Sequence, residues 1–339
     1  MKGAKKYIWM AVFLLLILLT VYVVTQQNDN FTLAGFLQYI SAASPVCLTA
    51  AVLCACGFVL FEGASLNCIL RSLGYRRPLR RGAVYSAADI YFSAITPSAT
   101  GGQPASAYFM MHDGVPGATS TITLLINLVM YSASLVTISL ICFLIRPSII
   151  MRFSTLSQTM IILGAVAQIA IGAVFLVIAL SSNTFRRISR FFIGLLCRLH
   201  ILKDAEGSAE RLEAAHREYS HCVEIIKKDK PMLIKTFLYN LLQRGSFIAV
   251  SMFVILATSD VSAIDAFVTQ AFIVLGYNYI PLPGGVGAAD YLFFDGFDKM
   301  VPDIVSTELI MRGISFYGCV IVCGLVTLIA YAVGKIKNK

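Results

Sequence analysis

Long apolar stretches separated by short polar segments dominate this chain. Six of these stretches approach or exceed the roughly 20 residues that a helix needs to cross the hydrocarbon core of a bilayer. They are residues 8–25, 45–70, 119–145, 158–181, 236–257 and 313–333. Soluble domains do not carry so many apolar runs of this length. The pattern therefore predicts an all-α polytopic integral membrane protein.

Two breaks rich in proline and glycine interrupt apolar sequence at corresponding places in the two halves of the chain. The first reads PSATGGQP over residues 97–104, and the second reads PLPGGVG over residues 281–287. Backbone outside a helix is tolerated at membrane depth only where protein or a wet cavity satisfies its N–H and C=O groups. In transporters, paired breaks of this kind indicate the binding site.

The lysines and arginines of the connecting segments predict the orientation, because cytoplasmic loops retain positive charge. The N-terminus, residues 71–81 and residues 183–235 are basic, whereas residues 26–44 and 258–265 contain neither lysine nor arginine. The C-terminal tail is basic again. We therefore expect both termini in the cytoplasm, with the first apolar stretch as an uncleaved anchor.

This charge pattern constrains how the two broken segments enter the membrane. Residues 83–111 must enter from the cytoplasm and return to it, and residues 266–297 must enter from outside and return outside. Two re-entrant hairpins of opposite orientation, each between two spans, form an inverted repeat. The alternative is that each hairpin is a pair of full spans. The chain is then one transmembrane domain, divided into residues 1–44 (anchor and external segment), 45–145 (first repeat), 146–235 (connecting span and cytoplasmic linker) and 236–339 (second repeat).

Composition supports the membrane class and narrows the chemistry. The chain is 58% hydrophobic and 13% charged, with a mean hydropathy of +0.79. The formal net charge of +9 fits cytoplasmic loops beside an anionic leaflet and does not indicate a nucleic-acid partner. Residues 206–218 read as a solvated charged helix of mixed sign. The nine cysteines contain no C-x-x-C pair, so we expect neither a metal site nor a cofactor.

Polar residues within the predicted spans are the best candidates for a transport path, since each costs free energy there. Asn240, Gln243 and Arg244 stand at i, i+3 and i+4, which places them on one helix face near mid-depth. The guanidinium of Arg244 could hold a lipid phosphate through two hydrogen bonds. It could equally form an internal ion pair with Glu62 or with a hairpin carboxylate. Glu62, at a similar depth in its own span, could hold an ammonium group.

Polar residues also flank the two breaks. Asp89 precedes the first break and Asp290 follows the second. Both aspartates could cap half-helices or contribute to a site. Gln103 and Asn278 could satisfy backbone groups that the breaks set free.

The two breaks also carry a resemblance to a known family. The sequences TPSATGGQP (96–104) and PLPGGVGA (281–288), in this order and with this layout of spans, resemble the transmembrane domain of the lysylphosphatidylglycerol synthase family. That family includes the bacterial multiple peptide resistance factor. The resemblance covers essentially the whole chain. It implies that the lipid path involves Pro97, Gly101, Gly102, Gln103, Pro104, Pro281, Pro283, Gly284, Gly285 and Gly287. The residues Arg244, Glu62, Asp89 and Asn240 are added from the physical argument above.

The resemblance implies a flippase-like protein of the bacterial cell membrane that moves aminoacylated phospholipid, such as lysylphosphatidylglycerol, between leaflets and so contributes to resistance against cationic peptides. The expected partners are the phospholipid substrate, the bilayer and a separate lipid-modifying synthase. One alternative is phosphatidylglycerol lysyltransferase activity, as the family name implies. We do not expect it, because the chain stops soon after its last span, without the soluble synthase domain of the family. Further alternatives are a small-solute secondary transporter and a purely structural membrane partner.

Overall fold

Five long apolar helices form the body of the protein in a computed structural model, which describes residues 32–96, 99–198, 205–280, 285 and 287–337. All five are long and apolar enough to cross a membrane. They are α3 (Pro45–Ser72), α6 (Gly117–Ile145), α7 (Thr155–Leu180), α10 (Lys230–Thr258) and a last helix over Ile304–Gly334. These helices confirm five of the six predicted spans. The remaining predicted span, residues 8–25, which was expected to be the anchor, lies outside the described residues.

The last span begins earlier than the sequence predicted. It consists of α13 (Ile304–Arg312), the π-helical segment η4 (Gly313–Gly318) and α14 (Cys319–Lys337), which follow one another without a break. The predicted start at residue 313 was wrong because Glu308 and Arg312 lower the local hydropathy. Both side chains are buried within the helix bundle, and the apolar helix long enough to cross a membrane runs from Ile304 to Gly334.

Two pairs of short helices form the expected hairpins. The first hairpin joins α4 (Leu79–Ile95) to α5 (Gly102–His112), and the second joins α11 (Ala263–Tyr277) to α12 (Ala288–Phe297). The longest of these, α4, has 17 residues, or about 25 Å at 1.5 Å per residue, which is short of a hydrocarbon core about 30 Å thick. The four helices are therefore half-helices of two hairpins and not four full spans.

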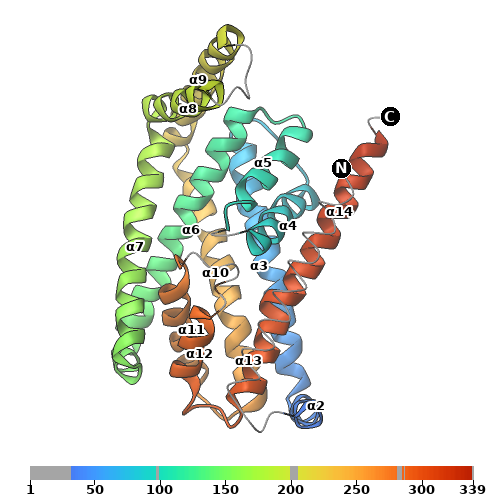
Figure 1. Cartoon of the computed structure of the whole chain (residues 1–339), viewed down its shortest axis with the longest axis vertical. Coiled ribbons are helices and arrows are strands. Elements are labelled where there is room, and N and C mark those ends of the chain that lie inside the picture. Colours follow the sequence, from blue (N-terminus) through green and yellow to red (C-terminus); the bar gives the residue numbers. More distant parts are fainter. Residues whose placement is uncertain (1–31, 97–98, 199–204, 281–284, 286, 338–339) are drawn as a thin grey trace.

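The two hairpins lie in opposite halves of the molecule (Figure 1). Each one stands between two spans along the chain, α3 and α6 for the first and α10 and the α13–α14 helix for the second. The contacts between the two units follow the same symmetry: α3 packs along α10, α4 packs against α14, and α11 packs against α6. We propose that residues 45–145 and 236–339 are the two inverted repeats.

Close approaches at glycine hold the hairpins against the spans. A Cβ atom on Gly82 of α4 would lie 2.3 Å from the carbonyl oxygen of Gly63 on α3. A Cβ atom on Gly164 of α7 would lie 2.1 Å from the carbonyl oxygen of Leu275 on α11. Small residues of this kind let helix backbones meet in membranes, where apolar burial alone provides no attraction between helices.

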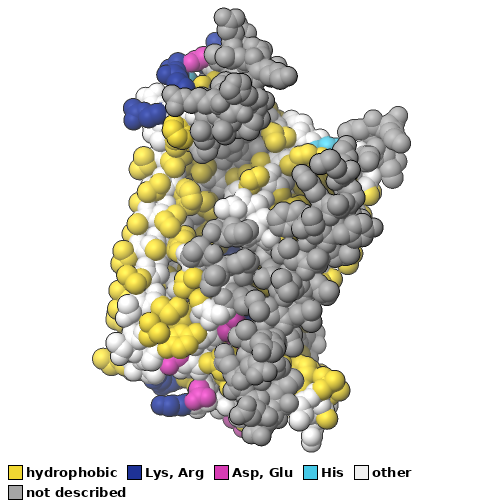
Figure 2. Space-filling model, viewed as in Figure 1, with side chains coloured by type: hydrophobic (Ala, Val, Ile, Leu, Met, Phe, Trp, Pro, Cys, Tyr) yellow, Lys and Arg dark blue, Asp and Glu magenta, His cyan; other side chains and the backbone are white. Residues whose placement is uncertain are grey.

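The remaining helices lie at the ends of the bundle. They are α2 (Leu33–Ala42), the 3-10 helix η2 (Pro147–Arg152), α8 (Ser182–Arg198) and α9 (Ala205–Lys228). The last of these confirms the charged helix predicted over residues 206–218, whereas α8 was not predicted. Hydrophobic side chains cover the face formed by α7, and charged side chains gather at its two ends (Figure 2). At the end away from α8, Arg146 and Arg152 both pair with Asp265.

Candidate functional site

Arg244 lies near the middle of α10 and is enclosed by aromatic rings from three helices. Its guanidinium carbon lies 4.1 Å from the ring centroid of Tyr131 on α6, 5.1 Å from that of Phe58 on α3 and 5.5 Å from that of Phe247 on α10. Only 6% of the residue is exposed. Cation–π contacts of this geometry contribute about 0.5–2 kcal/mol each. The rings hold the guanidinium in place but offer no acceptor for its N–H donors.

The charge of Arg244 is not neutralised by a direct ion pair. Among the described residues, no carboxylate oxygen lies within 4.0 Å of its guanidinium, no hydrogen bond to it is formed, and Nε is sealed from solvent. Arg244 and Glu62 therefore form no direct ion pair. An arginine at the centre of a spanning helix costs about 2.5–3.5 kcal/mol or more. Bidentate binding of an anion would use the guanidinium donors for which the described residues offer no acceptor.

Two carboxyl groups lie within electrostatic reach of this guanidinium. Glu62 of α3 accepts hydrogen bonds from Gln243 Nε2 at 3.0 Å and Ser86 Oγ at 3.1 Å. Asp89 of α4 lies beside Glu62 and accepts a hydrogen bond from Gln103 Nε2 at 2.6 Å. Gln103 thus binds a side chain of α4, while residues 97 and 98 of the break lie outside the described residues. The structure brings together Glu62, Asp89, Gln103 and Arg244 from both halves of the chain.

Asn240 belongs to a neighbouring polar cluster, one turn along α10. Its Nδ2 donates to Ser65 Oγ at 2.8 Å and to Asn127 Oδ1 at 3.0 Å. All three side chains are buried and come from three different spans. This cluster satisfies its own donors within the bundle, so its simplest role is to join α3, α6 and α10.

The tip of the second hairpin reaches the same region. Tyr131, whose ring covers Arg244, donates its hydroxyl hydrogen to Asn278 Oδ1 at 2.6 Å, and Asn278 Nδ2 donates to Gln168 Oε1 at 2.9 Å. Asn278 therefore binds side chains of α6 and α7, whereas most of the break whose backbone groups it was expected to satisfy lies outside the described residues. The aromatic cage and the hairpin tip form one connected unit.

The glycines of the first break shape the start of α5. The Gly101 N–H donates to Thr96 Oγ1 at 2.9 Å, which closes the hairpin tip. Gly102 is buried against Asp89: a Cβ atom there would lie 2.0 Å from Asp89 Oδ1. Pro104 lies in the first turn of α5 with its side chain exposed. Pro97 lies outside the described residues.

The second break uses positive φ angles that favour glycine. Gly285 has a φ of 67° and Gly287 a φ of 86°. Asp290 Oδ2 accepts a hydrogen bond from the Gly287 N–H at 2.6 Å, so this aspartate does cap α12. Asp89, by contrast, lies in the interior of α4 and not at either of its ends. Three other predicted site residues lie outside the described residues: Pro281, Pro283 and Gly284.

Sequence reasoning missed two sets of residues in the membrane interior. Phe58, Tyr131 and Phe247 give no signal in one sequence, because aromatic residues are ordinary in apolar spans. The pair Glu308 and Arg312 did carry a signal, since charges at i and i+4 stand directly before an apolar run. That pair was overlooked because the last span was expected to begin after it.

An apolar groove lies between α6, α10 and α11 on the side of the second hairpin. It has a volume of about 420 Å³, and it is lined by Ile138, Ile141, Cys142, Ile145, Leu241, Gly245, Met252, Ala263, Ile264, Phe267 and Val268. Several of these side chains are exposed on the outside of the bundle, among them Ile141, Ile145 and Ile264. Gly245, next to Arg244 in α10, leaves open space where a side chain would stand. The groove therefore opens sideways, toward the position of lipid.

These features define a polytopic helical membrane protein with two opposed re-entrant hairpins and charged side chains buried between them. The family model described as lysylphosphatidylglycerol synthase TM region matches residues 8–323. The chain belongs to this family. A search of curated proteins finds no match.

Proposed function

We propose that this protein moves an anionic or aminoacylated phospholipid, such as lysylphosphatidylglycerol, between the leaflets of a bacterial cell membrane. The observation that carries the proposal is Arg244, a buried guanidinium held by aromatic rings without a direct anionic partner among the described residues. A lipid phosphate is the anion that a membrane supplies to such a site. Two charge-assisted hydrogen bonds to it would contribute about 3–6 kcal/mol.

The neighbouring acidic groups suit the other charge of an aminoacylated headgroup. Glu62 and Asp89 lie beside one another and within electrostatic reach of Arg244. An aminoacyl ester places an ammonium group a few atoms from the phosphate. A zwitterionic headgroup with its phosphate at Arg244 and its ammonium near Glu62 and Asp89 would match the charges of the site.

The sideways-open groove distinguishes a lipid from a small solute. A site for a soluble substrate is closed off from the bilayer by protein, whereas this groove is apolar and reaches the outside of the bundle beside Gly245. We propose that one acyl chain lies in the groove while the headgroup occupies the region of Arg244. The basic residues of α8 and α9 support, under the positive-inside rule, the proposal that this end of the bundle and both termini of the chain are cytoplasmic.

The function is tested by labelling amino-lipids from outside intact cells with a membrane-impermeant reagent. We expect cells that carry the gene, together with a source of the aminoacyl lipid, to expose more of that lipid than cells without it. The total amount of lipid, measured after lysis, must be equal in both strains. Equal labelling of the two strains would refute translocation of that lipid.

Filling the groove is expected to slow transport without affecting the fold. In Gly245→Leu, the new side chain occupies space that is open in the wild type and excludes about two methylene groups of an acyl chain. At about 0.8 kcal/mol per methylene, the transport rate in proteoliposomes should fall about tenfold. Leu242→Phe is the matched control, because Leu242 is half-exposed on the same helix and does not line the groove. Equal rates for Gly245→Leu and the control would place the acyl chain elsewhere.

Lysyl transfer is the second candidate, and the family description is the observation that favours it. Purified protein incubated with lysyl-tRNA and phosphatidylglycerol distinguishes the two activities. We expect no lysyl-lipid product under conditions in which the same preparation moves lipid between leaflets. Product formation by the chain alone would make it an enzyme.

A further inference from the structure

A second charged cluster lies in the half of the molecule that contains the second hairpin. Glu308 of α13 is fully buried, with 0% of the residue exposed, and neither of its carboxyl oxygens accepts a hydrogen bond within the described part of the chain. The nearest cationic atom is Arg312 Nε, one turn along the same helix, at 3.5 Å from Oε1. This carboxyl group has no donor of its own at hydrogen-bond geometry.

Arg312 is already engaged by a different carboxylate. Its Nη2 donates to Asp290 Oδ1, while Asp290 Oδ2 accepts the hydrogen bond from Gly287 that caps α12. Asp290 is 1% exposed. Two buried carboxyl groups therefore share one guanidinium, and the better geometry belongs to Asp290.

Within the part of the chain that the structure describes, Arg312 is the one basic residue that forms an ion pair with Glu308. The helix α10 carries Arg244, whose guanidinium lies among the rings of Phe58, Tyr131 and Phe247. The helix α2 contributes Tyr39, whose hydroxyl bonds to Thr307 Oγ1 at 2.8 Å. Other titratable side chains on these elements are Lys230, Lys235 and Tyr239 on α10, Asp295 and Tyr291 on α12, which bond to Ser154, and Tyr317 on η4. An ionised Glu308 would thus be a second, uncompensated buried charge, which costs several kcal/mol.

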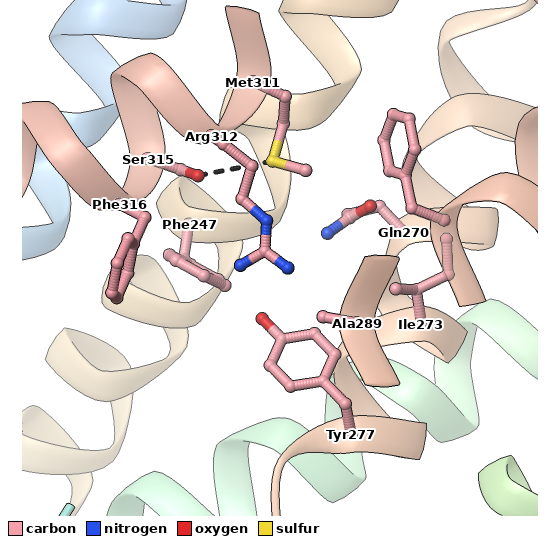
Figure 3. A pocket seen from close by; sticks show the side chains of 10 residues that line it. Phe247, Gln270, Ile273, Tyr277, Ala289, Met311, Arg312, Ser315 and Phe316 are labelled. Carbon is pink, nitrogen blue, oxygen red and sulfur yellow. Dashed lines mark hydrogen bonds between the residues drawn. The ribbon is translucent and has the colours of Figure 1, made fainter. Parts of the chain in front are cut away.

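A small cavity connects this cluster to the hairpin. It has a volume of about 50 Å³, and its lining includes Arg312, Tyr277, Gln270 and Ser315. The guanidinium of Arg312 points into it, with the Tyr277 hydroxyl and the Gln270 amide on either side (Figure 3). The lining is mainly apolar, but Arg312, Tyr277 and Gln270 offer polar groups, and a cavity of this volume can hold one water molecule. Water there would provide a relay for protons to and from the cluster.

The helix is irregular directly beside the cluster. The π-helical segment η4 begins at Gly313, immediately after Arg312. A Cβ atom on Gly313 would meet nothing within 4 Å, so no neighbouring element packs against the helix at this position. Single π-helical turns inside α-helices occur often at functional sites. The junction between α13 and α14 is therefore a natural hinge.

We propose that Glu308 binds one proton, and that uptake and release of this proton drive lipid translocation. A proton from water converts the carboxylate to the neutral acid, which leaves Arg312 paired with Asp290 and keeps α12 attached to α13. Release of the proton to water restores the carboxylate, which competes with Asp290 for Arg312 and loosens the second hairpin. The coupling rests on the proposed lipid transport, whereas the protonation of Glu308 does not.

Infrared difference spectroscopy of the reconstituted protein tests the protonation directly. We expect a C=O stretching band of a protonated carboxyl group that shifts in D₂O and titrates with pH. In Glu308→Gln this band should be lost. Glu213→Gln, which removes a half-exposed carboxylate of α9, should retain it. A spectrum in which Glu308→Gln keeps every protonated carboxyl band would overturn the proposal.

The coupling is tested with a pH gradient imposed across proteoliposomes. We expect the wild-type rate of lipid movement to change by up to about tenfold per pH unit of the gradient. In Glu308→Gln, the rate with the gradient should equal the rate without it. If the rate of lipid movement responds to a sodium gradient and not to a pH gradient, the site binds a metal cation and the proposal of proton binding is overturned. Absence of lipid movement in every condition would refute the proposed function and leave the infrared result standing.

Discussion

Replacement of Arg244 by alanine is expected to reduce lipid movement by at least about 100-fold. The variant loses two charge-assisted hydrogen bonds to the phosphate, or about 3–6 kcal/mol of headgroup binding. It should remain folded, because it also removes a buried charge that no direct ion pair neutralises among the described residues. The measurement is the rate at which fluorescent phosphatidylglycerol in proteoliposomes becomes accessible to an impermeant quencher.

Two further variants separate the role of Arg244 from a general loss of charge. Arg244→Lys keeps the cation but not the planar pair of donors, so we expect an intermediate rate. Arg152→Ala removes a half-exposed arginine that pairs with Asp265 at one end of the bundle, and it should transport at the wild-type rate. A wild-type rate in Arg244→Ala, with normal thermal stability, would show that the headgroup does not use this residue.

Replacement of Gly102 by alanine is expected to cause the largest loss of stability. The added methyl group would lie 2.0 Å from both Asp89 Oδ1 and Ser93 Oγ, and 2.6 Å from the backbone oxygen of Asp89. Side chains can rotate away, but the backbone oxygen can move only if α4 and α5 separate. We expect a loss of about 3 kcal/mol in the free energy of unfolding, measured as a lower melting temperature in detergent, together with loss of transport.

Gly117→Ala is the matched control for this substitution. Gly117 begins α6, and a Cβ atom there would meet only Met111 Sδ, at 3.5 Å. The control should melt within a degree or two of the wild type. Equal melting temperatures for Gly102→Ala and the control would mean that the first hairpin is not packed as tightly as described.

The spans and hairpins could be predicted from the sequence because their signals are local and strong. A run of apolar residues over 45–70 or 119–145 has few alternatives to a spanning helix. The re-entrant geometry followed from counting arginines and lysines in the loops, since two basic segments on the same side cannot be joined by an odd number of spans. The hydropathy signal failed once, at the start of the last span. Glu308 and Arg312 lower the local hydropathy there, so the predicted helix began too late.

The geometry of the site could be predicted only in part. Arg244 and Glu62 stood out because ionisable residues are rare at membrane depth, but the sequence left open whether they pair. The choice depends on neighbours that are distant in the chain, such as Tyr131 over the guanidinium and Ser86 at the Glu62 carboxylate. Ordinary aromatic and serine residues give no local signal of such roles, so only the fold shows them.

A high-resolution structure of the protein in nanodiscs of anionic phospholipid tests the central claim most directly. We expect phosphate density against the guanidinium of Arg244, with an acyl chain running into the groove beside Gly245. A structure in which the groove is empty and Arg244 pairs directly with Glu62 or Asp89 would contradict a lipid path through the membrane interior at this site.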